Sequence, residues 1–346
     1  MKRTLSLFLF LALVLWSLST AQAASKNSYE GKTVKIIAAA PPGGGFDAYA
    51  RLFARHMGKH LPGNPKTIVV NIPGGSGVIA ANYMYNIAKP DGATIAHASW
   101  GIAQMDYLGA TGVKYDVNKF NWLGLANVSP ITAAIRKDSP IQTAAQWLDP
   151  KTKPLIFGCT TRSSLTCSLP LALNQIFGPI TKVVPGYQGT APIRAGLLQG
   201  EVDGLTGWSW DSVKATGKGM LDDGSIKLIA YIGEKPNQEL DDLKVPYLTP
   251  KITKPEDKAF MKILMMPAAM LRPWMAPPGT SKEKVALLRK AFQDTLKDPE
   301  FLKDAKRSRI EVNPETGEWL AAFIKNMKAD VTPEVRNRAR KIIGLQ

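Results

Sequence analysis

The stretch Pro41-Pro42-Gly43-Gly44-Gly45-Phe46-Asp47 decides how this chain folds, and Ile72-Pro73-Gly74-Gly75-Ser76-Gly77 echoes it further along. Each stretch follows a β-branched run, Val34–Ile37 or Ile68–Val70, and precedes apolar residues at helical spacing. Two strand–turn–helix units in tandem predict a parallel sheet with two helix N-termini at the carboxyl ends of its strands. Unpaired backbone N–H groups and the positive end of the helix dipole bind anions there. The pattern therefore indicates a site for a small anion, with a carboxylate as the first choice.

Apolar periodicity predicts the helices that follow these turns. The first covers about residues 47–59 and ends at Leu61-Pro62-Gly63, and the second covers about 77–88 and ends before Pro90-Asp91-Gly92. Near the C-terminus, Thr280-Ser281-Lys282-Glu283 is a capping box ahead of a helix over about 285–296.

The first residues read as an export signal. Lys2 and Arg3 precede the apolar run Leu7–Trp16, and Ala21-Gln22-Ala23 matches a cleavage site. The run is too short to span a bilayer, and no later segment reaches about eighteen consecutive apolar residues. We expect residues 1–23 to be a signal peptide and the mature protein to reside in the periplasm of a Gram-negative cell without membrane insertion.

Composition narrows the class of protein. The chain of 346 residues is 45% hydrophobic and carries a net charge of +16, which fits a globular protein of two domains. Lysines and arginines are spread along the chain, and the dense run Arg336–Lys341 reads as the solvated face of a C-terminal helix. No zinc-finger, RNP or basic-zipper pattern is present, so we expect no nucleic acid partner.

Catalytic and metal chemistry have little support. His56 and His60 are four residues apart, but Lys59 lies between them and the glutamate of a metalloprotease motif is missing. The only other histidine is His97, and the chain has no G-x-S-x-G motif, so the sequence gives little support for a catalytic triad with a nucleophile and a histidine base. We expect no catalytic residue, no metal and no cofactor. Cys159 and Cys167 face an oxidising compartment, and the sequence leaves open whether they form a disulfide.

The middle of the chain repeats the strand–turn–helix theme. A strand at Leu155–Gly158 precedes the polar loop Cys159–Ser164 and a helix over about 171–177. A strand at Lys182–Pro185 precedes the turn Gly186–Thr190 and a helix over about 191–198. We therefore expect a second α/β domain, entered near residue 129 and left near residue 231.

The order of these motifs resembles one family, the periplasmic solute receptors of tripartite tricarboxylate transporters, also called Bug-type receptors. The matching pieces occur along nearly the whole mature chain. They are the P-P-G-G-G-x-D-x-x-A-R start at 41–51, N-x-P-G-G-x-G at 71–77, the turn at 90–92, G-Y-x-G-x-x-P at 186–192, the L-x-x-G-E-V-D run that ends at Asp203, and A-P-P-G-T at 276–280.

The resemblance implies a two-lobed periplasmic binding protein fold of type II character, in which two α/β domains are joined by two crossing segments. Lobe I would comprise residues 24–128 and 232–346, and lobe II residues 129–231. The protein would be a monomeric receptor, not an enzyme, that clamps a small organic acid between its lobes and delivers it to membrane permease subunits. Two alternatives remain open: the closed form could report the solute to a two-component sensor, or the chain could be an exported enzyme acting on a carboxylate.

The resemblance also implies ligand-binding residues. They are Gly44, Gly45, Phe46, Ser76 and Gly77 in lobe I, and Thr160, Thr161, Arg162, Ser163, Gln188, Gly189 and Thr190 in lobe II.

The residue types add candidates and alternatives. Asp47 either complements the helix dipole or contacts an amino or hydroxyl group of the ligand. Arg162 either pairs with a second carboxylate or is a surface residue, and Trp100 and Trp208 either pack or stack on the ligand. Many relatives have a small hydroxyl residue where this chain has Phe46.

Overall fold

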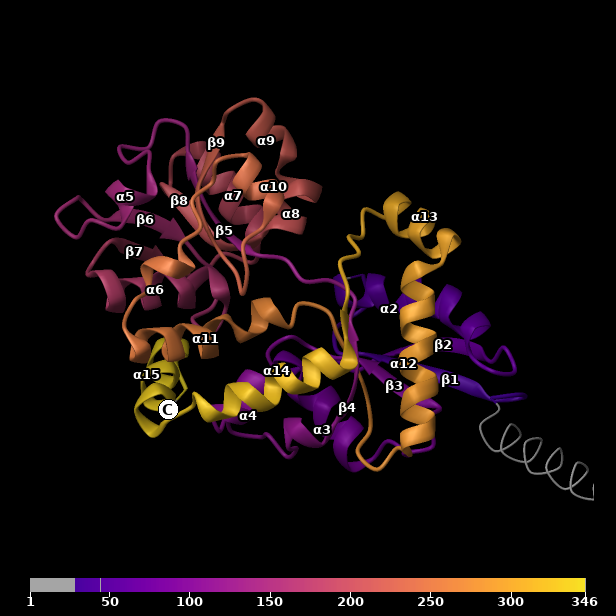
Figure 1. Cartoon of the computed structure of the whole chain (residues 1–346). Helices are drawn as coiled ribbons and strands as arrows, with labels where there is room; N and C mark the ends of the chain where they lie inside the picture. The colour runs from indigo at the N-terminus through magenta and orange to yellow at the C-terminus, as the bar shows by residue number, and fades with distance from the viewer. Residues whose placement is uncertain (1–28, 44, 346) are drawn as a thin grey trace, which may run out of the picture.

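Two sheets organise the molecule. The computed structural model describes residues 29–43 and 45–345, so the proposed signal peptide lies outside the described part. Figure 1 shows two bodies, one built on each sheet, with part of the C-terminal third of the chain beside the N-terminal third in one of them. This is the mixed α/β, two-lobed fold that the sequence predicts.

The first sheet has six strands in the order β11-β4-β10-β3-β1-β2. Its strands are β1 (Thr33–Ala38), β2 (Lys66–Asn71), β3 (Thr94–His97), β4 (Asn121–Leu125), β10 (Pro273–Ala276) and β11 (Glu315–Thr316). β1 runs parallel to both β2 and β3, whereas β10 is antiparallel to β3 and β4. The carboxyl ends of β1, β2 and β3 therefore meet at one edge of this sheet.

The second sheet has five strands in the order β7-β6-β8-β5-β9. They are β5 (Ile131–Arg136), β6 (Leu155–Gly158), β7 (Thr181–Val184), β8 (Gly204–Ser209) and β9 (Ile226–Ile232). β6 runs parallel to β7 and β8, and β5 is antiparallel to β8 and β9.

Helices cover both sheets. Those in the first half of the chain are α2 (Gly45–His56), α3 (Val78–Asn86), α4 (Ile102–Tyr107), α5 (Ala144–Trp147), α6 (Leu165–Phe177), α7 (Thr190–Gln199), α8 (Trp210–Thr216) and α9 (Lys218–Asp222). Those that follow are α10 (Gln238–Asp242), α11 (Pro255–Ala269), α12 (Lys282–Lys297), α13 (Pro299–Arg307), α14 (Gly317–Ala329) and α15 (Pro333–Ile343). Short 3-10 turns lie at Met57–His60, Gly75–Gly77, Val117–Lys119 and Thr249–Lys251.

An aromatic cluster packs against the face of the first sheet that is covered by α2. The ring of Phe53 lies 4.3 Å from that of Trp274, 5.1 Å from that of Phe292 and 4.9 Å from that of Phe301, measured between centroids. These rings come from α2, β10, α12 and α13, so the packing joins the two ends of the chain (Figure 1). Buried aromatic rings contribute much of the apolar area of such a core.

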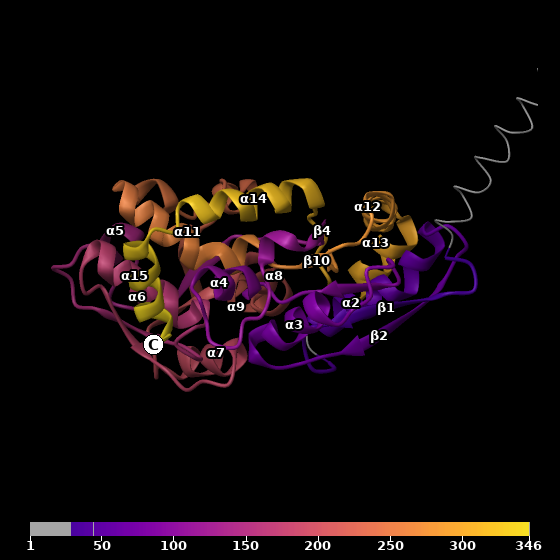
Figure 2. The same ribbon diagram turned by 90° about the horizontal axis from the view of Figure 1, so that it is seen from below.

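The two bodies share a continuous core. Buried side chains of the first sheet, such as Ile37 and Ala96, belong to the same cluster as Ala133 and Phe157 of the second. α11 contacts α4, α6 and α15, and α15 also contacts α6. Figure 2 shows α11 and α14 along the top of the view and α3 and α7 toward the bottom. The exact division into lobes at residues 128 and 232 stays a prediction.

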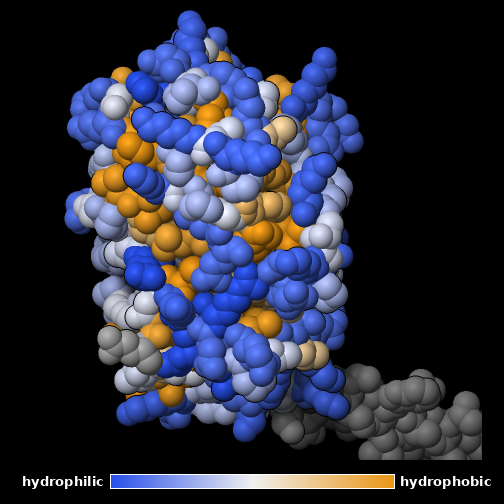
Figure 3. Space-filling view, turned by 90° about the vertical axis from the view of Figure 1, so that its left-hand side faces the viewer, coloured by the Kyte–Doolittle hydropathy of each residue, from blue (hydrophilic) through white to orange (hydrophobic). Residues whose placement is uncertain are grey.

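The surface is polar with scattered apolar side chains. Figure 3 shows the face on the left of Figure 1, where charged and polar residues are interspersed with apolar ones. Among the described residues, no helix combines the length and the apolar character that crossing a membrane requires.

Candidate functional site

The two glycine-rich turns open at the same edge of the first sheet. Ala38 at the end of β1 lies beside Asn71 at the end of the parallel strand β2, so the turns that follow are neighbours. α2 begins at Gly45 directly after the first turn, and α3 begins at Val78 after the second. The first N–H groups of a helix have no acceptor within the helix. The N-termini of these two helices therefore lie beyond the ends of neighbouring parallel strands. Gly44 lies outside the described residues.

The second turn depends on glycine for two reasons. Gly77 has a φ of +94°, in the left-handed region. A Cβ on Gly77 would also lie 2.2 Å from the Cβ of Ser99, so the backbone approaches the loop after β3 too closely for any side chain. Ser76 is exposed and itself has a φ of 53°. The turn is held in one shape, with the Ser76 side chain accessible.

Asp47 ties the two turns together. Its buried carboxylate accepts hydrogen bonds from the Gly43 N–H (2.9 Å), the Arg51 Nε (2.8 Å) and the Asn71 Nδ2 (2.8 Å). The hydrogen bond from Arg51 is the main cause that lowers the pKa of Asp47 to about 2. Both carboxylate oxygens therefore have donors within the chain, which favours a positioning role over contact with a ligand.

Phe46 and Trp100 form an aromatic patch beside these turns. Their ring centroids lie 5.7 Å apart in an edge-to-face arrangement, and Trp100 is 38% exposed. Phe46 also packs edge-on against His97, whose ring is fully buried. Burial, together with the charge of Arg272, holds the pKa of His97 well below its ordinary value, so the imidazole is neutral at pH 7. The patch offers an apolar surface for the body of a ligand.

Arg272 completes this patch, and sequence reasoning missed it. Its guanidinium lies 5.1 Å from the ring centroid of Phe46, 4.8 Å from that of Tyr49 and 6.0 Å from that of Trp100. In the sequence it is a single arginine before Pro273. Because its ring partners come from α2 and from the loop after β3, no local signal could have identified it.

The polar loop after β6 is fixed by a disulfide. Cys159 and Cys167 are bonded, with their Cα atoms 5.1 Å apart, which answers the question that the sequence left open. The Thr160 hydroxyl donates to the Ser164 hydroxyl at 2.6 Å. Thr161 and Ser163 have exposed side chains with hydroxyl oxygens 3.5 Å apart. The bridge and these hydroxyl contacts shape a polar loop at the carboxyl end of β6.

Arg162, in the same loop, has partners within the chain. Its Nε donates to the carbonyl oxygen of Ile342 at 2.9 Å, and its Nη2 donates to that of Lys341 at 3.2 Å. These carbonyls lie in the last turn of α15, where basic side chains bind favourably. Arg162 therefore fastens the C-terminal helix to this loop.

The turn before α7 is open to solvent. Gln188 is exposed and donates to the Gly186 carbonyl oxygen at 3.2 Å, and α7 begins at Thr190. Gly189 has a φ of +145°, and a Cβ there would meet no atom within 4 Å. This turn lies at the carboxyl end of β7 and matches the two turns of the first sheet.

Trp208 lies deeper than a residue that stacks on a ligand. It is 1% exposed, and the guanidinium of Arg194 from α7 lies 5.0 Å from its ring centroid. The assignment of Trp208 to the ligand remains a prediction, and Arg194 is the side chain that covers it.

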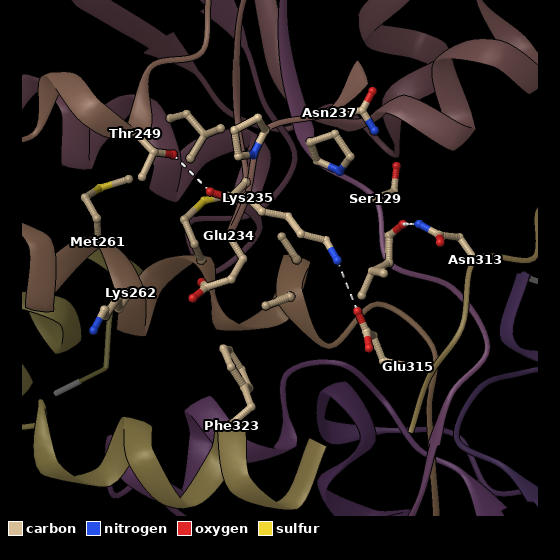
Figure 4. Close-up of a pocket in the computed structure, with 18 of the residues that line it drawn as sticks. Ser129, Glu234, Lys235, Asn237, Thr249, Met261, Lys262, Asn313, Glu315 and Phe323 are labelled. Carbon is tan, nitrogen blue, oxygen red and sulfur yellow. Dashed lines mark hydrogen bonds and ion pairs between the residues drawn. The ribbon is translucent and has the colours of Figure 1, made fainter. Parts of the chain in front are cut away.

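A separate cavity of about 370 Å³ lies beside the two crossing segments. Residues 128–130 and 232–237 line it together with α11 and α14, and Figure 4 shows Met261 and Phe323 pointing toward it. Two of its lysines are in ion pairs, Lys235 with Glu315 at 3.3 Å and Lys262 with Asp330 at 2.9 Å. The cavity suits apolar groups better than a carboxylate.

The histidines of α2 and the following turn contact the acidic residues of α13 and its N-cap. His56, Asp298 and Glu300 come close enough together to hold a metal ion. However, the Lys59 ammonium lies 2.6 Å from Asp298 and 2.5 Å from Glu300, so a cation of the chain already neutralises both carboxylates. His60 contacts Asp298 at 3.0 Å. The cluster reads as an ion-pair network that joins α13 to α2.

Residues 49–338 match the sequence profile of the tripartite tricarboxylate transporter family receptor. The chain belongs to this family. Relatives and solved structures agree with the assignment. A UPF0065 protein of Bordetella bronchiseptica is 29% identical over 206 residues, which are 58% of this chain and 60% of that protein. The chain thus spans 60% of the length of this curated relative.

Two solved structures share the fold. A TctC solute binding protein from Polaromonas, solved without ligand, is 24% identical with a TM-score of 0.71, over 90% of this chain and all of that one. MatC from Rhodopseudomonas palustris, solved with bound malate, is 20% identical with a TM-score of 0.58, over 90% of this chain and 98% of that one. The matched family is one of transporter receptors.

Proposed function

We propose that this protein captures a small organic carboxylate between its two lobes in the periplasm and delivers it to the membrane permease of a tripartite transporter. The observation that carries the proposal is the pair of helix N-termini, α2 and α3, at one sheet edge. Backbone N–H groups and helix dipoles at such an edge stabilise negative charge.

The opposite face of the crevice would come from the second sheet. The loop Cys159–Ser164 and the turn Gly186–Thr190 follow the parallel strands β6 and β7 and offer hydroxyl and amide groups. Closing the lobes would remove water from the carboxylate and strengthen its hydrogen bonds. The malate bound in MatC is a small carboxylate of this kind.

We propose binding without turnover. Two ionisable groups lie beside the glycine-rich turns. The carboxylate of Asp47 accepts three hydrogen bonds within the chain and has a lowered pKa, and the His97 ring is buried and neutral. Neither is free to transfer a proton to a substrate at pH 7.

A thermal-shift screen tests the binding. At a ligand concentration of a hundred times Kd, the folded state gains about 2.7 kcal/mol, which raises the Tm of a protein of this size by about 4 °C. We expect at least one C3–C8 mono- or dicarboxylate to produce such a shift, and the matching uncharged amide to produce none. Equal shifts with acid and amide, or no shift with any acid, would refute carboxylate binding.

Delivery and export have their own tests. Labelled carboxylate should enter proteoliposomes holding the permease subunits only when the receptor is added, and mass spectrometry should recover the bound acid unchanged.

The mature protein from a periplasmic extract should begin at Ala24 or within a residue or two of it, because cleavage follows Ala21-Gln22-Ala23. An intact mass that retains Leu7–Trp16 would rule out this export route.

A further inference from the structure

Two half-buried arginines, Arg272 and Arg194, have no carboxylate partner among residues 29–43 and 45–345. Each guanidinium instead lies over aromatic rings, that of Arg272 over Phe46 and Tyr49 and that of Arg194 over Trp208. Removing a charge from water without a partner is costly, and stacking on rings recovers only part of that cost. Both positions are therefore suited to an anion that binds from outside the chain.

Arg272 lies at the sheet edge where the glycine-rich turns open. Its carbonyl oxygen accepts a hydrogen bond from Ala126 N–H at 3.0 Å, and that of Pro273 accepts one from Ala98 N–H at 2.9 Å. These bonds place it at the carboxyl ends of β3 and β4. The Arg272 Nε is buried without an acceptor. The guanidinium makes a long hydrogen bond, 3.3 Å, to the Leu271 carbonyl oxygen and also contacts the Tyr49 hydroxyl.

The acidic groups nearest this arginine form no ion pair with it, although the Asp211 Oδ1 is itself buried without a hydrogen-bond donor. Both Asp211 and Glu311 act electrostatically on the Tyr49 hydroxyl, as Arg272 does, so all three charges surround that side chain. Asp211 accepts a hydrogen bond from Asn127 Nδ2 at 3.0 Å, and Glu311 accepts one from Lys214 at 2.7 Å. Neither carboxylate forms an ion pair with Arg272.

Arg194 occupies the matching place in the other body. It lies in the second turn of α7, the helix that follows the open turn at Gly189, and its guanidinium covers the ring of Trp208 at the end of β8. Burial lowers the pKa of Arg194 below its ordinary value, because the guanidinium has lost contact with water and no anion in the described part of the chain compensates for its charge. Figure 2 places α7 in the half built on the second sheet and β10, which Arg272 precedes, in the half built on the first.

We propose that Arg272 and Arg194 each bind one carboxylate of the ligand, so that this receptor selects dicarboxylates that bridge the two lobes. The proposal rests on the carboxylate-binding function above and assigns the charged contacts of that site. A guanidinium forms two parallel hydrogen bonds to a carboxylate, and rings that hold its plane reduce the ordering needed on binding. Arg162 is not part of the pair, because its guanidinium already donates to two carbonyl oxygens of α15.

Calorimetry with matched acids tests the assignment. The probes are succinate and butyrate, adipate and hexanoate, and malate and 3-hydroxybutyrate, each pair differing by one carboxylate. The wild-type protein should bind at least one dicarboxylate a hundredfold more tightly than its monocarboxylate. Arg272→Gln and Arg194→Gln should each lower that affinity at least thirtyfold, about 2 kcal/mol, and reduce the preference for the dicarboxylate to within threefold.

Controls separate binding from folding. Arg336→Gln removes the same charge from an exposed site on α15 and should change affinity less than twofold. Without ligand, the Tm of Arg272→Gln and Arg194→Gln should equal or exceed that of the wild type, because each variant loses an unpaired, partly desolvated cation. Arg272→Lys keeps the charge without the planar fork and should fall between wild type and Arg272→Gln.

The outcomes distinguish this inference from the function on which it rests. Tight binding of a monocarboxylate that both glutamine variants retain would preserve carboxylate binding and overturn the arginine pair. Lower Tm values in the ligand-free variants with unchanged affinity would show that the arginines only support the fold. An equal loss of affinity in Asp211→Asn and Arg272→Gln, with the dicarboxylate preference intact, would assign Arg272 to an ion pair between the lobes and also overturn the proposal.

Discussion

The close approach of Gly77 to Ser99 permits a prediction with a built-in rescue. Gly77→Ala places a Cβ where φ is +94° and where the Cβ of Ser99 would be 2.2 Å away. The left-handed backbone costs a residue with a Cβ about 1–2 kcal/mol, and overpacking adds about 1–3 kcal/mol. We therefore expect the free energy of unfolding to fall by about 2–5 kcal/mol, with weaker carboxylate binding because the N-terminus of α3 is displaced.

Two further variants divide this cost into its parts. Gly43→Ala changes a glycine with a φ of +85° and no atom within 4 Å of the new Cβ, so it should lose only the backbone component of about 1–2 kcal/mol. Ser99→Gly removes the clashing Cβ, so the double variant Gly77→Ala/Ser99→Gly should recover about 1–3 kcal/mol relative to additivity.

Equilibrium unfolding in guanidinium chloride, followed by circular dichroism, measures all of these differences. Calorimetry with the acid identified by the thermal-shift screen measures the accompanying change in affinity. If Gly77→Ala were no more destabilising than Gly43→Ala, or if Ser99→Gly restored nothing, the close contact between the turn and the loop after β3 would not constrain the site.

Further predictions concern the disulfide and the buried carboxylates. Replacing both Cys159 and Cys167 with serine should lower the free energy of unfolding by about 2.5 kcal/mol for a loop this short, and an unchanged denaturation midpoint would contradict a disulfide. Asp47→Asn should cost about 1–2 kcal/mol at pH 7, because the carboxylate accepts three hydrogen bonds, one of them from the half-exposed Arg51. The pKa values of Asp47 and Asp304 lie at about 2, below the ordinary 3.8, so their stabilisation should be complete above pH 4–5 and disappear as the pH falls through 4 toward 2. Denaturation measured across that range should show a shallower pH dependence in Asp47→Asn than in wild type, and parallel curves would refute the assignment.

Local sequence determined the helices in which apolar spacing and capping residues indicate the same boundaries. The helix expected over about 47–59 is α2, Gly45–His56, continued by a 3-10 turn to His60. The helix expected after the capping box is α12, but its N-cap is Ser281 instead of Thr280, and the Ser281 hydroxyl accepts a hydrogen bond from Lys284 N–H at 3.3 Å. Such features depend on groups within one or two turns, and a single sequence contains all of them.

One helix began earlier than the sequence suggested. The expected helix over about 171–177 is α6, which starts at Leu165 and contains Pro170 in its second turn. A proline has no N–H to donate and disfavours the interior of a helix. Here Pro170 is buried among apolar neighbours, and tertiary packing outweighs the local preference.

The composition of the site was decided by the tertiary structure. The sequence identified the glycine-rich turns, because glycines between a β-branched run and a helical pattern indicate a tight turn from a strand into a helix. It could not assign Arg162, whose guanidinium finds its acceptors at Lys341 and Ile342, or Arg272, whose rings come from α2 and the loop after β3. Whether an arginine is paired or free depends on which distant segments fold against it, and that is a property of packing rather than of neighbouring residues.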